Sequence, residues 1–211
     1  MARPIVYGPA ASTYVWSARL ALAEKGVAHD LVDVPFGEHQ KQPHLARHPF
    51  AKVPAFEHDG FALYETQAIL RYIDERFMSS PLQSTDVHEF SRMNQIMGIV
   101  DAYAWPAIAR GIIFNRLLAP RLGLPVDEAA VAKALPRARL CLAEIARLKG
   151  EQPYLAGERI SLADLMVAPL LAYLARIPDG EAPLAEHPSL RQWLRDMEGR
   201  QSFQVTKPPG L

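Results

Sequence analysis

The side chains of this sequence best able to do chemistry are one cysteine, four histidines in one stretch, and polar residues at two expected helix starts. The cysteine, Cys141, stands between Leu140 and Leu142 in a helical pattern, so we interpret it as a small buried apolar residue. A single thiol cannot form an internal disulfide, which is typical of a protein in a reducing compartment. Disulfide chemistry is therefore not expected from this chain.

The histidines stand at spacings of five, four and ten residues: His39, His44, His48 and His58. Structural zinc sites use tighter and more regular spacings, usually with cysteines, and no cysteine lies in this stretch. We therefore expect no metal site here.

Two polar positions precede apolar helical patterns. Ser12, with Thr13 beside it, lies where a strand-like run turns into the first helix, and Glu65-Thr66 begins another helix. Such residues often cap a helix by accepting hydrogen bonds from its free N–H groups. The same helix starts also attract anions, because the free N–H groups and the helix dipole carry partial positive charge. The residues themselves leave both interpretations open.

Several other kinds of site are excluded. No two glycines are separated by one residue, so the dinucleotide motif G-x-G-x-x-G is absent, as are G-K-[ST], H-E-x-x-H and G-x-S-x-G. The 23 basic and 23 acidic residues cancel, which gives no electrostatic footprint for nucleic acid or an anionic membrane. We also find no apolar stretch that approaches the roughly 18 residues of a membrane span. Neither nucleic acid nor a membrane is expected as a partner.

The elements that must position these residues change in character along the chain. Residues 1–78 alternate between short strand-like runs and helices. Strands are expected at residues 4–7, 29–34, 55–58 and 61–64. A helical repeat separates the first two strands, Asp59-Gly60 gives a hairpin signal between the last two, and a helix follows over 66–77. The order βαβ and then ββα predicts a small mixed α/β sheet.

A linker rich in serine and proline, residues 79–85, separates this part from an all-helical domain over 86–211. Helical periods are found at residues 86–118, 127–149, 161–175 and 189–200. Ser161 and Asp164 form a Ser-x-x-Asp capping box at the start of the third. Prolines inside these periods are expected to kink or divide the helices.

Segments in order along the chain carry a family resemblance. They are YGPAAST and RLALAEKG within residues 7–26, HPFAKVPAF at 48–56, ET at 65–66 and SLADL at 161–165. Together they resemble the cytosolic glutathione S-transferase family, and most closely its serine-type phi-like and bacterial members. The resemblance covers nearly the whole chain. It implies a thioredoxin-like N-terminal domain that binds glutathione and a C-terminal helical bundle that binds an electrophile.

The resemblance implies roles for the two polar helix starts. Ser12 would donate a hydrogen bond to the glutathione thiolate, with Thr13 as the other candidate donor. Glu65 would pair with the ammonium of the γ-glutamyl residue, and Thr66 would bind its carboxylate at the helix start.

The resemblance also implies a cis bond between Val53 and Pro54. Such a bond would leave the Val53 backbone free to pair with the cysteinyl residue of glutathione, as one added strand residue. The glycyl carboxylate needs a cation, and His39, Lys41 and Lys52 are the candidates. The adjacent His-Lys pair of the phi type is not reproduced, since the lysine comes one place later, so the choice among them stays open.

An apolar pocket for the electrophile is expected mainly in the helical half. Tyr103, Arg110 and Phe114 are spaced by seven and four residues, which predicts a shared helix face. Tyr14 and Trp16 follow Ser12 and are expected to reach the same pocket. Such a stripe is more often interior packing, and the electrophile is not identified by it.

The function implied is conjugation of glutathione, as a co-substrate and without a metal, to small hydrophobic electrophiles, as in cytoplasmic detoxification. Glutathione-dependent isomerisation or peroxide reduction would use the same thiolate. A non-catalytic binding module of the same fold is the alternative outside enzymes. The family also implies a homodimer, in which the expected exposed residue Phe50 would contact the partner.

Overall fold

The computed structural model describes residues 2–211, which form two compact units. The first unit contains the described residues up to Leu82 together with Arg200–Leu211, and the second contains Gln83–Gly199. Each unit has its own buried core.

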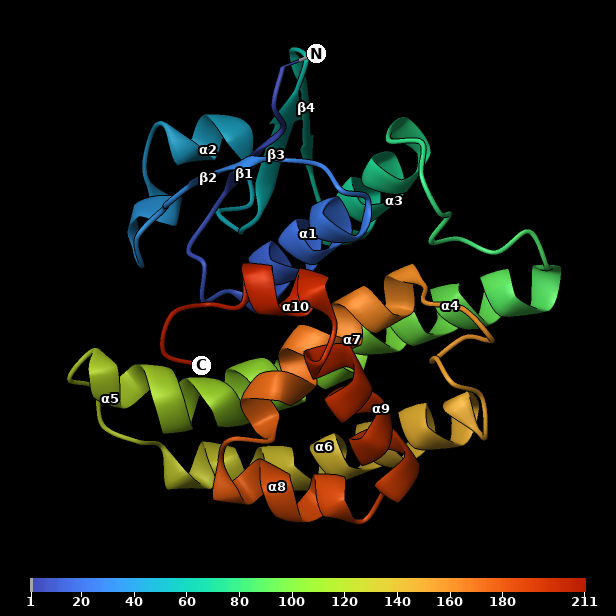
Figure 1. Cartoon of the computed structure of the whole chain (residues 1–211). Helices are drawn as coiled ribbons and strands as arrows, with labels where there is room; N and C mark the ends of the chain where they lie inside the picture. Colours follow the sequence, from blue (N-terminus) through green and yellow to red (C-terminus); the bar gives the residue numbers. More distant parts are fainter. Residues whose placement is uncertain (1) are drawn as a thin grey trace. The chain divides into compact units, whose positions relative to one another are not determined.

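The first unit is built on a four-stranded mixed sheet (Figure 1). Its strands are β1 (Ile5–Tyr7), β2 (Asp30–Val32), β3 (Ala55–His58) and β4 (Phe61–Tyr64). The strand order is β2-β1-β3-β4, with β1 parallel to β2 and the other two pairs antiparallel. This is the sheet expected from the order βαβ and then ββα, and it confirms the thioredoxin-like fold.

Helices of this unit are α1 (Thr13–Glu24), α2 (His44–Arg47), α3 (Thr66–Arg76) and the short 3-10 turn η1 (Glu38–Gln40). Helix α1 packs against α3, and its apolar residues Leu20 and Leu22 are fully buried. From α3, Ile69, Leu70 and Ile73 are equally buried. The periodic apolar positions of both helices therefore form the core beneath the site.

The end of the chain returns to this unit, where α10 (Gln201–Thr206) lies along α1 (Figure 1). The Trp16 ring is 4.6 Å from that of Phe203, and its Nε1 donates to Thr206 Oγ1 at 3.0 Å. Arg200 donates two hydrogen bonds to the Glu24 carboxylate at 2.7 and 2.8 Å. The sequence predicts that residues 200–211 belong to the helical domain 86–211, whereas the structure assigns them to the first unit. The contacts responsible join positions far apart in the chain, so no local pattern indicates them.

The second unit is helical (Figure 1). Its helices are α4 (Val87–Ile99), η2 (Val100–Leu118), α5 (Ala119–Arg121), α6 (Glu128–Lys149), α7 (Leu162–Leu174), α8 (Pro178–Ala185) and α9 (Pro188–Glu198). The helical periods predicted from the sequence are all present. Helix α8 was not predicted, since its two prolines mask the pattern. Helices α6 and α7 continue without a break through Pro136 and Pro169.

Helix α4 continues into η2, which contains Pro106 and follows the wider π-type turn. Proline removes a backbone donor and crowds the preceding turn, so widening the helix accommodates it. By length and composition alone, Val87–Arg121 is apolar enough to cross a membrane, which corrects the expectation that no stretch would be. It packs against α6 and α7, as the core helix of a soluble protein also does.

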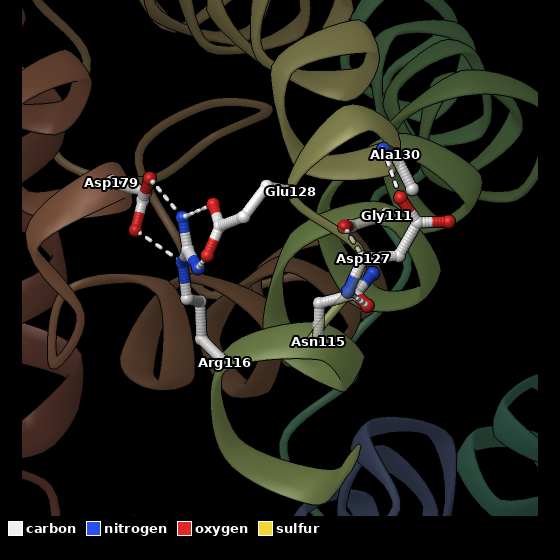
Figure 2. A network of polar contacts seen from close by, with 7 residues as sticks. All are labelled: Gly111, Asn115, Arg116, Asp127, Glu128, Ala130 and Asp179. Carbon is white, nitrogen blue, oxygen red and sulfur yellow. Dashed lines mark hydrogen bonds and ion pairs between the residues drawn. The ribbon is translucent and has the colours of Figure 1, made fainter. Parts of the chain in front are cut away.

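Polar side chains within the second unit form hydrogen bonds and ion pairs with one another. Figure 2 shows the Arg116 guanidinium between two carboxylates, with Nε donating to Asp179 Oδ2 at 2.7 Å and Nη1 to Glu128 Oε1 at 2.6 Å. Arg116 thereby connects η2 with α6 and α8. It also holds the pKa of Asp179 below its usual value, through the hydrogen bonds it donates.

The capping box predicted at the start of α7 is present. The buried Asp164 carboxylate accepts from the Ser161 backbone and hydroxyl at 2.8 and 2.7 Å. It also accepts from the Leu155 N–H at 3.0 Å and from Trp193 Nε1 at 2.8 Å. One carboxylate therefore joins the start of α7, the preceding loop and α9.

Candidate functional site

Gly8, directly after β1, lets three parts of the first unit meet. It has φ 145°, and a Cβ placed on it would lie 2.5 Å from Val15 Cγ2 and 3.0 Å from Val53 Cβ. Side chains other than hydrogen do not fit this space or this conformation. Glycine therefore brings Val53 beside the first turn of α1.

Ser12 is the N-cap of that turn. Its Oγ accepts from the Val15 N–H at 3.4 Å, and the residue is partly exposed, whereas Thr13 is only 8% exposed. A hydroxyl that accepts a hydrogen bond still keeps its own proton to donate. Capping and donation to a ligand are thus compatible at Ser12, and Ser12 is the more accessible of the two candidates.

Tyr7, at the end of β1, carries another hydroxyl close in sequence to Ser12. Its Oη donates to Glu57 Oε2 at 3.0 Å, and the Arg47 guanidinium lies 4.3 Å from its ring centre. Burial, followed by the hydrogen bond to Glu57, raises the pKa of Tyr7. Its proton is therefore already committed within the protein.

Glu65 and Thr66 lie where β4 meets α3. Glu65 has φ 70°, which is uncommon for a residue with a side chain, and its carboxylate does not cap the helix that it precedes. The residue is exposed, while Thr66, the first residue of α3, is 7% exposed. Backbone strain of this kind concentrates at functional sites. The simple capping interpretation of Glu65 is therefore wrong.

The Val53–Pro54 bond is cis, as the resemblance implied. Within the described residues, neither the N–H nor the C=O of Val53 has a hydrogen-bond partner. Residue 53 thus has both backbone groups free, two residues before β3 begins.

Of the candidate cations, Lys41 is engaged by another residue, since its Nζ lies 2.8 Å from Glu38 Oε1. His39 accepts at Nδ1 from the Gly37 N–H at 3.3 Å, which leaves its Nε2 as the donor. Burial lowers the pKa of His39, and the nearby His44 and Lys52 lower it further. The structure therefore places His39 and Lys52 in one electrostatic neighbourhood.

The expected pocket residues belong to both units. Tyr14 is partly buried on α1, but Trp16 is fully buried in the contact with α10. This placement of Trp16 differs from the expectation that it lines a pocket, because an apolar residue four positions before Leu20 faces the core.

Tyr103, Arg110 and Phe114 lie on η2, where Tyr103 and Arg110 are exposed and Phe114 is partly buried. The Arg137 guanidinium lies 5.8 Å from the Tyr103 ring centre. The shared face predicted for the three assumed an ordinary helical turn. It does not follow for the wider turn of η2.

Phe50 is 67% exposed, and its ring lies 6.1 Å from that of Tyr64, which is 38% exposed. The His48 ring also packs beside Tyr64, with 4.8 Å between the two ring centres. The exposed aromatic residue expected in this loop is therefore present and adjoins the edge strand β4.

Sequence reasoning missed two residues that shape this site. Gly8 is marked only by its place directly after a strand, and His44 is not distinguishable by pattern from the neighbouring histidines. His44 Nε2 lies 2.7 Å from the Lys52 carbonyl oxygen. No group of three or more histidine, cysteine or acidic residues in positions 2–211 could hold a metal ion.

The fold defines a class: a thioredoxin-like unit with free backbone groups at Val53, followed by a helical unit. Residues 6–81 match the family model of the glutathione S-transferase N-terminal domain, and residues 128–196 match that of the C-terminal domain.

Relatives match over nearly the full length. Glutathione S-transferase F7 of Arabidopsis thaliana is 30% identical over 93% of this chain and 95% of its own. The crystal structure of glutathione transferase F7 from Populus trichocarpa is 29% identical, with a TM-score of 0.86 over 96% of this chain and 97% of that one. Glutathione S-transferase I from maize, in complex with an atrazine glutathione conjugate, is 26% identical, with a TM-score of 0.85 over 97% and 96%.

The chain belongs to the glutathione S-transferase family, and its plant relatives are phi-class members at about 30% identity. It is therefore a transferase with glutathione as its co-substrate.

Proposed function

We propose that this chain is a serine-type transferase that conjugates the glutathione thiolate to small hydrophobic electrophiles, with Ser12 as the thiolate donor. The observation that supports this most directly is the junction at Gly8. Val53, whose backbone N–H and C=O are both free, and Val15, whose N–H is capped by Ser12, both lie against Gly8. A cysteinyl residue paired with Val53 would bring its sulfur toward the start of α1.

The remaining groups suit the two ends of glutathione. Glu65 would bind the γ-glutamyl ammonium, and the start of α3 at Thr66 would bind the carboxylate of the same residue. Lys52 and His39 would bind the glycyl carboxylate, and Lys41 is the weaker candidate because Glu38 already pairs with it. A pure binding module has no need for the strained, exposed carboxylate of Glu65, so we favour an enzyme.

Donation from Ser12 stabilises the charged form of the glutathione thiol and so lowers its pKa. The gain is limited, because a less basic thiolate is also a weaker nucleophile. Holding the electrophile close to the sulfur must then supply most of the rate. We assign that task to an apolar pocket of the helical unit, for which the η2 residues Tyr103, Arg110 and Phe114 are the candidates. Atrazine is a suitable first electrophile, since a maize relative is known with its glutathione conjugate.

We also propose a cytoplasmic homodimer with Phe50 at its interface. Exposed aromatic residues in an otherwise polar loop are favourable when a partner covers them. The functional domains proposed are 1–78 for glutathione and, for the electrophile, the helical range 86–211 without its last twelve residues, which belong to the first unit; 79–85 joins the two. Light scattering should give twice the mass of the chain, and Phe50→Ser should shift the protein toward monomer.

Ser12→Ala tests the thiolate assignment. Without the donor, the ultraviolet absorbance of bound thiolate should titrate at higher pH, and the conjugation rate at pH 7 should fall by up to about threefold, because the smaller thiolate fraction is partly offset by a more nucleophilic thiolate. The loss should shrink as pH rises and the thiolate forms unaided. Glutathione affinity should change little, because the other contacts remain.

Thr13→Val is the matched control, since it removes the neighbouring hydroxyl. If Thr13→Val moves the thiolate titration and Ser12→Ala does not, Thr13 is the donor. If neither variant moves it, a hydroxyl at this helix start does not stabilise the thiolate.

A further inference from the structure

His44, the first residue of α2, is buried at 3% exposure, and its Nε2 lies 2.7 Å from the Lys52 carbonyl oxygen. A carbonyl oxygen only accepts hydrogen bonds, so this contact requires the proton on Nε2. The other ring nitrogen, Nδ1, is then an acceptor, and it is buried with no partner in the described part of the chain. The ring of His44 is therefore fixed to the backbone through a single contact.

That contact sets the direction of the next backbone N–H. Among the described residues only Gln42–Pro43 and Val53–Pro54 are cis, so the peptide between Lys52 and Val53 is trans. In a planar trans peptide the C=O and the N–H point in opposite directions. Because His44 holds the Lys52 C=O on one side, the Val53 N–H must point to the other side, where it has no protein partner.

The rest of the loop leads the chain back to this contact. The His48 N–H donates to the His44 carbonyl at 2.9 Å, and the Ala51 N–H donates to the His48 carbonyl at 3.0 Å. These two turns bring Lys52 back to the His44 ring, which closes the loop from residue 44 to residue 52. The peptide before Val53 is thus held at one point by a side chain and not by a strand partner.

His44 leaves one ring nitrogen buried without a partner, which costs stability, while its single hydrogen bond fixes the Lys52 carbonyl. An apolar ring would remove both the unpartnered nitrogen and the donor to that carbonyl. We propose that His44 is a positioning residue of the glutathione site: its Nε2–H holds the Lys52 carbonyl and thereby aims the Val53 N–H at the ligand. The proposal rests on the assignment of Val53 to glutathione binding.

The test compares His44→Phe, which keeps a ring and removes the donor, with His44→Gln, which keeps a donor of similar reach. Calorimetry with S-methylglutathione should show affinity reduced by about tenfold in His44→Phe and mostly restored in His44→Gln. At saturating glutathione, kcat should stay within about twofold in both, because the sulfur donor is untouched. His58→Phe is the matched control, since His58 is equally buried but its ring contacts the Tyr72 hydroxyl. It should lower Tm without changing affinity.

Nitrogen NMR of the His44 ring in the wild-type protein gives a measurement that does not depend on a variant folding. It should show Nε2 protonated and Nδ1 bare, and a bare Nε2 would overturn the proposal. Equal affinity in His44→Phe and wild type would overturn it too, as would equal losses in the Phe and Gln variants. Glu65→Ala separates this from the proposed function: if it weakens binding while His44→Phe does not, only the role of His44 fails.

Discussion

The two units differ in how completely their polar groups are satisfied. In residues 2–211, the non-glycine residues with positive φ all belong to the first unit: Ala51, Asp59 and Glu65. The buried side-chain atoms without a partner belong to it as well: Arg19 Nε, His44 Nδ1, His48 Nδ1 and His58 Nε2. In the second unit, by contrast, Asp164 is saturated by four donors and Arg116 by two carboxylates.

This contrast separates two requirements. A site for a charged tripeptide must leave donors, acceptors and strained backbone open for the ligand, at a cost in stability. A helical unit with an apolar pocket has no such demand and can pair its polar groups internally. Variants in the second unit should therefore change stability first, and variants at the edge of the first unit should change binding first.

The largest expected effect is on stability, from Asp164→Ala. This change leaves the Trp193 indole N–H and the Leu155 and Ser161 backbone N–H groups buried without an acceptor. We expect a loss of about 4 kcal/mol in the free energy of unfolding, measured by urea denaturation.

Asp164→Asn should lose less of the free energy of unfolding, because the amide oxygen still accepts hydrogen bonds. Its NH2 group is itself a donor, however, and would face one of the donors that the carboxylate binds. Glutathione affinity of the folded protein should be unchanged in both. A stability loss below about 1 kcal/mol for Asp164→Ala would contradict the view that this carboxylate holds the second unit together.

At Glu65 we expect a substitution to change glutathione binding more than stability. Glu65→Gly removes the charged contact and relaxes a backbone at φ 70°. Glutathione binding should weaken by about 2 kcal/mol, or roughly thirtyfold, while the free energy of unfolding rises by about 1 kcal/mol. Calorimetry and denaturation of the same samples measure both.

Glu65→Gln separates the charge from the strain, since the backbone keeps a side chain. It should weaken binding without the gain in stability. If Glu65→Gly and Glu65→Gln have the same stability, the strain at this position is not relieved by glycine.

Much of the fold could be predicted from the sequence, because the signals for its elements are local. The hairpin at 55–64 and helices α3, α6 and α7 were found because each carries its own turn, period or cap signal. The return of residues 200–211 to α1 and the burial of Trp16 were not, because both depend on contacts between the two ends of the chain. Helix α8 was masked by its prolines.

Within the candidate site, Ser12, Val53 and Glu65-Thr66 could be proposed from motifs at fixed positions in the chain. The choice among cations did not, because it depends on which side chains pair across loops. Only the structure shows that Lys41 pairs with Glu38 and that Lys52 acts electrostatically on His39. The role of His44 depends on the direction of one peptide plane, which no residue pattern encodes.

A smaller effect is expected from pH, through His39. Its pKa is lowered in the free protein by burial and by the nearby His44 and Lys52, and a carboxylate bound beside it would raise that pKa again. Binding then takes up a proton, so affinity should rise as pH falls through the range between the two pKa values. We expect a gain of about threefold to tenfold from about pH 8 to about pH 5.

S-methylglutathione is the suitable ligand for this measurement, because its sulfur does not titrate. His39→Asn should flatten the profile. His48→Asn is the control, since burial also lowers the pKa of His48 but its ring packs on Tyr64. If the pH dependence of affinity persists in His39→Asn and disappears in His48→Asn, the proton taken up on binding belongs to His48 and not to His39.

The smallest expected effect concerns Ala51, which has φ 52° and whose N–H closes the turn at His48. A left-handed alanine costs about 1–2 kcal/mol, and glycine there costs about 0.5–1 kcal/mol of additional chain entropy. Ala51→Gly should therefore raise the free energy of unfolding by about 0.5 kcal/mol, and Ala62→Gly in β4 should lower it by a similar amount. Because no side chain is lost from the ligand-facing groups, glutathione affinity should stay the same in both.

A gain in stability without a change in binding would show that strain in the first unit divides into two kinds. The strain at Glu65 would serve the ligand, whereas the strain at Ala51 would only close a loop. If Ala51→Gly instead weakens binding, the stiffness of residues 48–51 belongs to the site, and the contact between His44 and Lys52 is not sufficient to hold the peptide before Val53.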